Sequence, residues 1–234
     1  MPAMLMAPVV AGLLSTGAFA AGPAEGLFYQ LPPDGTWARF RVSYTFKAGE
    51  QQQSGEQTLW MASVGEVTEQ GEPCRWIEFR QDAVENGVKR FWIRKLLIPV
   101  RYLKQGENPT AHVLRGWTQQ ETGDVEPAVA VHGRWPALLA GPLQDQKQLP
   151  PATVRTSLGT LTAEGFSGWI TFDEGNQRSR VTFETRVHPK APFGVLASRM
   201  VFDVSIEGTS YTIDSTAELA GSGVGATTAL PEHR

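Results

Sequence analysis

The sequence contains a single cysteine and four histidines among 234 residues, so it offers little material for disulfide bonds or metal sites. Cys74 has no second cysteine to pair with, and its place in a strand-like stretch indicates a small buried residue rather than a nucleophile. His112, His132 and His188 show none of the spacings of known metal-binding motifs. We therefore expect no metal ion and no other cofactor.

A strong charge of one sign is also missing. Lys and Arg number 21 against 24 Asp and Glu, and the resulting net charge of -3 does not favour nucleic acid as a partner. Glycine patterns that cradle phosphates are absent, and the segment from Gly165 to Gly168 is one residue short of a G-x-S-x-G motif. Two of five carboxylates could come together in space as the acid pair that glycoside hydrolysis requires. Each of the five, however, falls on the expected solvent face of a strand: Glu78, Asp82, Glu184, Asp203 and Asp214. We expect a non-catalytic protein.

Long apolar runs are absent except near the N-terminus. Residues 1–20 carry no charged side chain, include an apolar stretch from Met4 to Leu14, and reach small residues at Ala18 and Ala20. This pattern is typical of a secretory signal peptide that is cleaved after Ala20, with a retained membrane anchor as the alternative. A periplasmic or secreted location is expected, rather than a cytoplasmic one.

Alternation of apolar and polar residues dominates the chain after residue 36. From Trp37 to Phe46 the even-numbered positions are apolar and the odd-numbered ones largely polar, which predicts a half-buried strand. The segment 57–64 predicts a second strand. Five more strands are expected after residue 150, over 154–158, 161–172, 180–187, 196–206 and 211–218.

A hairpin is predicted over residues 74–98, because Asn86-Gly87 supplies the two positive φ angles of a type I′ turn. With a two-residue loop, opposite partners have numbers that sum to 173. This register places Glu78 opposite Lys95 and Trp76 opposite Leu97. Both faces are largely apolar at the end away from the turn, so we expect another segment to cover that end on both sides.

Four parts of the chain are expected: signal peptide 1–20, lead-in 21–35, one β-rich domain 36–220, and a flexible tail 221–234. A helical insert is predicted over 99–141, because Asn108-Pro109 has the pattern of a helix start and Trp117 continues an apolar helical spacing. A further helical turn is predicted at Pro136. The fold class is therefore α+β, mainly antiparallel β: a curved sheet or half-barrel of about nine strands with a short helical lid inserted midway.

Two short motifs resemble a known group of proteins. Residues 154–163, VRTSLGTLTA, are similar to a V-x-T-x-x-G-x-x-x-A/C strand-turn-strand element of secreted bacterial envelope proteins of unknown function. Residues 187–196, VHPKAPFGVL, resemble the V-P-x-G-V-V element of the same proteins, although the tryptophan that often precedes it is missing. These proteins resemble the periplasmic lipoprotein-carrier (LolA/LolB-like) superfamily. The resemblance implies a half-barrel with a helical lid over an apolar groove.

Two functions remain open from the sequence. The first is an exported protein that binds an apolar or lipid-like ligand in the groove, with the helices near 99–118 as the lid. Its expected lining residues share the apolar face of the strands: Phe40, Tyr44, Phe46, Phe183, Met200, Phe202 and Ile213. The second is a structural or interaction module of the cell envelope, with a packed barrel and a basic edge that docks on an anionic membrane surface or an envelope protein. That edge would comprise Lys89, Arg90, Arg94, Lys95, Arg101 and Lys104.

Overall fold

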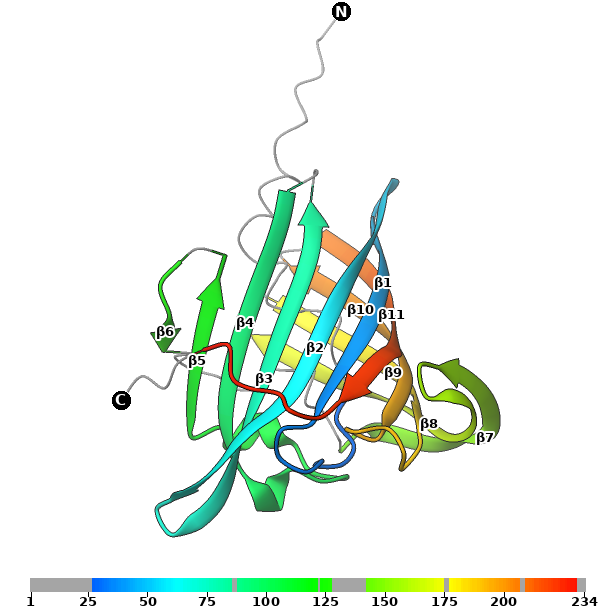
Figure 1. Cartoon of the computed structure of the whole chain (residues 1–234). Coiled ribbons are helices and arrows are strands. Elements are labelled where there is room, and N and C mark those ends of the chain that lie inside the picture. Colours follow the sequence, from blue (N-terminus) through cyan, green and yellow to red (C-terminus); the bar gives the residue numbers. More distant parts are fainter. Residues whose placement is uncertain are drawn as a thin grey trace, which may run out of the picture.

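The computed structural model describes residues 27–85, 88–121, 123–127, 142–174, 177–206 and 209–230. They form one curved antiparallel sheet of eleven strands (Figure 1). The strands are β1 (Trp37–Ala48), β2 (Gln51–Glu69), β3 (Glu72–Glu85), β4 (Val88–Pro99), β5 (Arg115–Gln120), β6 (Glu126–Pro127), β7 (Gln144–Thr156), β8 (Gly159–Glu174), β9 (Gln177–Val187), β10 (Val195–Ile206) and β11 (Thr209–Gly223). The nine predicted strands are all present, and β5 and β6 are additional.

The strand order is β6-β5-β4-β3-β2-β1-β11-β10-β9-β8-β7. The chain therefore starts at the centre of the sheet, proceeds outward to the β6 edge, and returns from the β7 edge to pair β11 with β1. Strands that are consecutive along the chain pair with each other, except across the connection between the two edges. The terminal pairs Ala48–Gln51, Glu85–Val88, Glu174–Gln177 and Ile206–Thr209 lie at the same end of the sheet, which we call the hairpin end.

The predicted α+β class is wrong. Within the described residues the helical structure is limited to two 3₁₀ turns, η2 (Val100–Tyr102) and η3 (Pro109–His112). Asn108 does cap η3, since its Oδ1 accepts from Thr110 N at 3.2 Å, but the backbone is already extended at Val113. Residues 115–120 then form β5, which pairs with β4. The backbone groups of this segment make their hydrogen bonds to β4 rather than within a helix. There is therefore no helical lid in 99–121, and the turn predicted at Pro136 lies outside the described residues.

The predicted hairpin register is confirmed. Glu78 lies opposite Lys95, Trp76 opposite Leu97, and Ile77 opposite Leu96. Burial on both faces at this end of the hairpin is confirmed as well, because Trp76 and Ile77 point to opposite faces and are 4% and 0% exposed. The turn residues Asn86 and Gly87 lie outside the described part of the chain.

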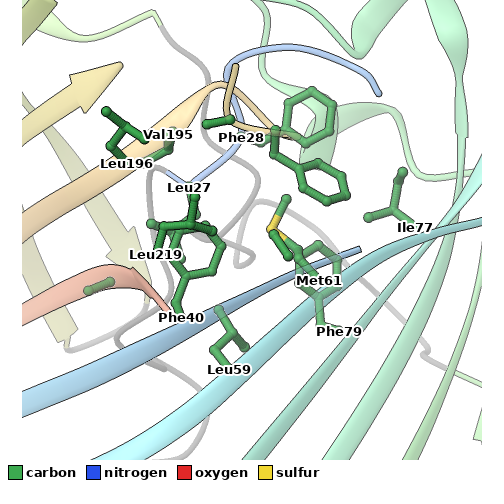
Figure 2. Close-up of a cluster of buried hydrophobic side chains, with 14 of the residues drawn as sticks. Leu27, Phe28, Phe40, Leu59, Met61, Ile77, Phe79, Val195, Leu196 and Leu219 are labelled. Atoms are coloured by element: carbon green, nitrogen blue, oxygen red, sulfur yellow. The ribbon is translucent and has the colours of Figure 1, made fainter. Parts of the chain in front are cut away.

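One face of the sheet is concave and carries the main core. Figure 2 shows side chains from β1, β2, β3, β10 and β11 converging on Leu27 and Phe28. The odd-numbered side chains of β3 and the even-numbered side chains of β1 and β4 point into this core. Because strand side chains alternate between faces, all concave positions can be followed from strand to strand through the register.

The end opposite the hairpin end is closed by loops rather than by helices. Residues 27–35, the described part of the lead-in, pack against the loop between β9 and β10. Tyr29 N and Gln30 N both donate to the carbonyl of Phe193, at 2.8 and 3.2 Å. The Phe28 and Phe193 rings pack with centroids 5.8 Å apart. The second resembling motif, 187–196, thus provides half of this plug. The first motif forms the β7–β8 hairpin, as its strand-turn-strand pattern predicts.

Residues 221–230 of the predicted flexible tail make defined contacts in the structure. Residues 221–223 belong to β11, and residues 224–230 cross the convex face of the sheet toward β4 and β5 (Figure 1). We call residues 224–230 the C-terminal strap. Its anchor is the Glu78 carboxylate, which accepts from Thr228 Oγ1 at 2.6 Å and from Ala229 N at 3.0 Å. Leu230 is fully buried at the end of the strap. Residues 231–234 lie outside the described part of the chain.

Candidate functional site

A second apolar cluster lies on the concave face, separate from the main core. This hairpin-end cluster is built on β8, β9 and β10 and comprises Ile170, Val181, Phe183, Met200, Phe202 and Val204. Tyr211 and Ile213 of β11 and Leu143 pack against it. The strand register places it toward the hairpin end, since Phe202 lies beside Ile213, which lies beside Phe46. The six side chains of this cluster are 0–7% exposed, so a second buried apolar cluster lies beyond the plugged end of the sheet.

The seven predicted groove residues do share the concave face, but they divide between two places. Phe183, Met200, Phe202 and Ile213 belong to or pack against the hairpin-end cluster, whereas Phe40 is part of the main core. Phe46 contacts Tyr211, with ring centroids 5.4 Å apart. The ring of Tyr44 lies across Gly55 of β2, where a β-carbon would be 2.6 Å from the tyrosine hydroxyl. That close approach explains why this strand position is glycine.

Buried polar side chains border the main core on its side toward the hairpin end. We call this group the polar belt: Gln57, Gln81, Thr185, Ser198 and Ser215. Thr185 and Ser198 share a hydrogen bond of 3.0 Å on neighbouring strands, and Gln81 Nε2 donates to Gln57 Oε1 at 2.6 Å. On β9 and β10 the belt stands directly between Val187 of the main core and Phe183 of the hairpin-end cluster. The apolar surface at the hairpin end thus borders hydrogen-bonding groups.

The predicted basic edge is not assembled as one surface. Arg90 and Arg94 point to the concave face, whereas Lys89 and Lys95 point to the convex face. Lys95 is 1% exposed, with Nζ 4.9 Å from the centre of the Trp76 ring. Away from β4, Arg101 forms an ion pair with Glu72 at 2.9 Å. The backbone of Lys104 forms an isolated antiparallel β-bridge with Gln30 of the lead-in. The six basic residues are thus distributed over both faces and both ends of the sheet.

Arg94 is the unusual member of this set. Its guanidinium lies 4.0 Å from the centre of the Trp92 ring on the concave face, and burial lowers the pKa of Arg94 to about 8. Burial of a cation costs stability because water is removed from the charged form. The neighbouring Arg90 forms an ion pair with Glu121. One cation is therefore held in a desolvated position close to Trp92, whose cross-strand partner is Gln81.

The carboxylates considered for hydrolysis lie mainly on the convex face and have their own partners. Asp82 accepts from Arg80, and Asp203 accepts from Thr212 at 3.0 Å. Asp214 accepts from Arg199 at 3.0 and 2.8 Å, and this contact lowers the pKa of Asp214. The Asp214 pair borders a shallow hollow of about 540 Å³ on this face. Within the described ranges, no group of three or more His, Cys, Asp or Glu side chains is placed to hold a metal ion.

Sequence reasoning missed the polar belt and the strap. The belt had a visible signal: Ser215 interrupts the apolar alternation from Ile213 to Leu219, and Gln57 and Gln81 occupy inward positions on their strands. The strap had none, because its contacts are with Glu78, some 150 residues away. Among the described residues, no helix is both long and apolar enough to cross a membrane.

Comparison with known proteins yields distant structural similarity only. No protein-family model and no curated protein matches the chain. A candidate exported protein with a YmcC-like fold from Bacteroides fragilis aligns with 84% of this chain and 99% of its own, at 9% identity and a TM-score of 0.37. A candidate lipoprotein from Parabacteroides distasonis aligns with 84% of this chain and 98% of its own, also at 9% identity and a TM-score of 0.37. A DUF1329 family protein from Desulfovibrio piger aligns with 78% of this chain and 84% of its own, at 10% identity and a TM-score of 0.20.

One of these three proteins is named as exported and another as a lipoprotein. None of the three is named as a lipoprotein carrier, so that part of the resemblance stays a prediction. With TM-scores below 0.5, the similarities establish neither a family nor a function for this chain.

Proposed function

We propose that the protein is exported and binds an apolar, lipid-like ligand on the concave face of its sheet, over the hairpin-end cluster. The observation that carries the proposal is that this cluster is distinct from the main core. The fold is plugged at the other end by the lead-in and Phe193, and the main core is complete there. The ligand would be enclosed among the side chains of this second cluster, which are 0–7% exposed on the same concave face.

The shape of the surface supports a chain-like ligand. The cluster extends along three neighbouring strands through the cross-strand pairs Met200–Phe183 and Phe202–Val181. Phenylalanine, methionine and β-branched side chains present hydrocarbon along its length, and methionine adapts to ligands of different shape. Such a surface suits an acyl chain better than a compact polar metabolite.

Native mass spectrometry of the exported protein, purified without detergent, tests both parts of the proposal. The denatured mass should correspond to a chain that begins at Ala21. The native spectrum should contain an additional mass that is lost on denaturation and recovered in an organic extract. A native mass equal to the denatured mass, together with an extract free of lipid, would overturn the binding proposal.

A charge at the cluster should prevent ligand retention. Ile213 is half-buried beside the cluster, so Ile213→Lys can place its ammonium group toward water while it disrupts the apolar surface. We expect this variant to lose the adduct and to remain folded by circular dichroism. The matched control is Ser210→Lys, at an exposed position that points to the convex face of the same strand, and it should retain the adduct.

A further inference from the structure

Two buried side chains of opposite charge lie under the end of the C-terminal strap on the convex face. Glu78 of β3 and Lys95 of β4 are cross-strand neighbours, and they are 7% and 1% exposed. The Glu78 carboxylate accepts from Ala229 N at 3.0 Å and from Leu230 N at 3.3 Å. Lys95 Nζ donates to the Leu230 carbonyl at 3.5 Å. The two side chains therefore bind both the N–H and the C=O of a passing backbone.

The same place also distinguishes between side chains of the bound segment. Thr228 Oγ1 donates to Glu78 at 2.6 Å, and Leu230 is fully buried. Ala229 between them is exposed, so its side chain is not selected. Hydrogen bonds to the main chain provide affinity in this arrangement, and the side chains two residues apart provide specificity, as in other sites for extended peptides. The bound pattern is a hydroxyl residue, any residue, and leucine.

A cover for this face would not need buried charges. Removal of a carboxylate and an ammonium group from water is unfavourable, and well-packed apolar side chains in their place are often equally stabilising or better. The charges do discriminate, however, because a segment that leaves them without hydrogen bonds is strongly disfavoured. Glu78 and Lys95 are therefore better suited to select one kind of segment than to stabilise the sheet.

The strap is a displaceable occupant of this place. Val224 is 82% exposed and residues 227–229 are exposed as well, while Ala226 N donates to the Gly35 carbonyl at 2.8 Å. A terminal segment with so few buried side chains opens locally at a small cost in free energy. Glu78 and Lys95 keep their positions when it opens, because they lie on paired strands. The place is thus preformed, and its occupant can leave.

We propose that Glu78 and Lys95 form a peptide-recognition site, which the strap occupies in cis and which binds an extended segment of a partner protein with the pattern Ser/Thr-x-Leu. A partner protein is favoured over the strap of a second copy, because exchange of identical straps gains no contact and loses the entropy of association. The site lies on the opposite face of the sheet from the hairpin-end cluster, so it does not depend on the proposed ligand there.

Fluorescence anisotropy with a labelled, C-terminally amidated peptide of residues 224–230 tests the site on the full mature chain. Leu230→Asp should displace the strap of the protein, because it places a charge at a fully buried position. This variant should bind the peptide at least about tenfold more tightly than wild type, in which the tethered strap competes at an effective concentration of about 1 mM.

Substitutions in the peptide test recognition without any change in the protein. Thr228→Val in the peptide removes the hydroxyl that donates to Glu78, and it should weaken binding to the Leu230→Asp protein about five- to tenfold. Thr227→Val is the matched control at the exposed neighbouring position, and it should bind like the parent peptide. Equal affinities of these two peptides would overturn the inference, because the pattern would not be recognised.

The protein variants give two further decisive outcomes. Leu230→Asp that folds and binds the peptide no better than wild type would overturn the site. Thr228→Ala replaces Leu230→Asp if the latter does not fold, since it loosens the strap at an exposed position. It should bind about two- to threefold more tightly than wild type, and equal affinity would contradict the inference. A wild-type dimer that forms with rising concentration, and that Leu230→Asp does not form, would assign the site to a second copy and overturn the partner protein.

Discussion

Glu78→Ala should destabilise the protein by about 3–5 kcal/mol, the cost expected when one member of a buried set of charged groups is removed. Glu78 is 7% exposed and lies opposite Lys95, which is 1% exposed. Its carboxylate also accepts from Ala229 N at 3.0 Å and from Leu230 N at 3.3 Å. The substitution removes the carboxylate that faces the lysine and, with it, the acceptor that holds the C-terminal strap. Guanidinium chloride unfolding measures the loss.

The strap should be released in the same variant. Hydrogen exchange of the amides of Ala229 and Leu230 should become fast in Glu78→Ala, while exchange in β8–β10 at native conditions changes little. The control is Glu218→Ala, which breaks the exposed pair with Arg41 and should cost less than about 1 kcal/mol. A second variant, Glu78→Ala with Lys95→Met, should recover part of the loss, because it removes the buried cation as well. Equal losses for Glu78→Ala and Glu218→Ala would contradict this account of the strap.

The sequence determines the strands and the pairing of the β3–β4 hairpin because these features depend on local alternation and on a two-residue turn. Glu78 and Lys95 are opposite one another whatever covers them, so their pairing could be predicted. The segment that covers them could not be predicted, because the strap has no periodicity, is rich in alanine and threonine, and owes its order to contacts with a distant strand. Residues 115–120 are predicted as helix because this strand is only six residues long and follows Asn108-Pro109, which has the pattern of a helix start.

The candidate site was predictable to a similar degree. The inward side of each strand follows from alternation, so the apolar residues of the hairpin-end cluster, such as Phe183 and Phe202, could be assigned to one face. Their separation from Phe40 depends on where the plug lies, and the plug is formed by two segments that the sequence indicates only as loops. Ser215 is visible as an interruption in its strand, but its burial follows only from the packing of neighbouring strands.

The plug leads to the second large effect, which concerns Phe28. We expect Phe28→Ala to cost about 3–5 kcal/mol, because its side chain is 1% exposed and its removal leaves a cavity in the main core. The loss also removes the aromatic contact with Phe193, the residue whose carbonyl accepts from Tyr29 N. Thermal and urea unfolding of the purified variant measure the change. The result decides whether the lead-in is part of the domain or a linker before it.

Phe91→Ala provides the matched control for this prediction. Phe91 is a half-buried phenylalanine of β4 that points to the convex face, with the Arg80 guanidinium 5.4 Å from the centre of its ring. The same truncation there should cost about 1 kcal/mol or less, since the site can fill with water. If Phe28→Ala and Phe91→Ala are equally stable, the lead-in does not contribute to the core, and the plugged end that separates the main core from the hairpin-end cluster would have to be formed by the 188–194 loop alone.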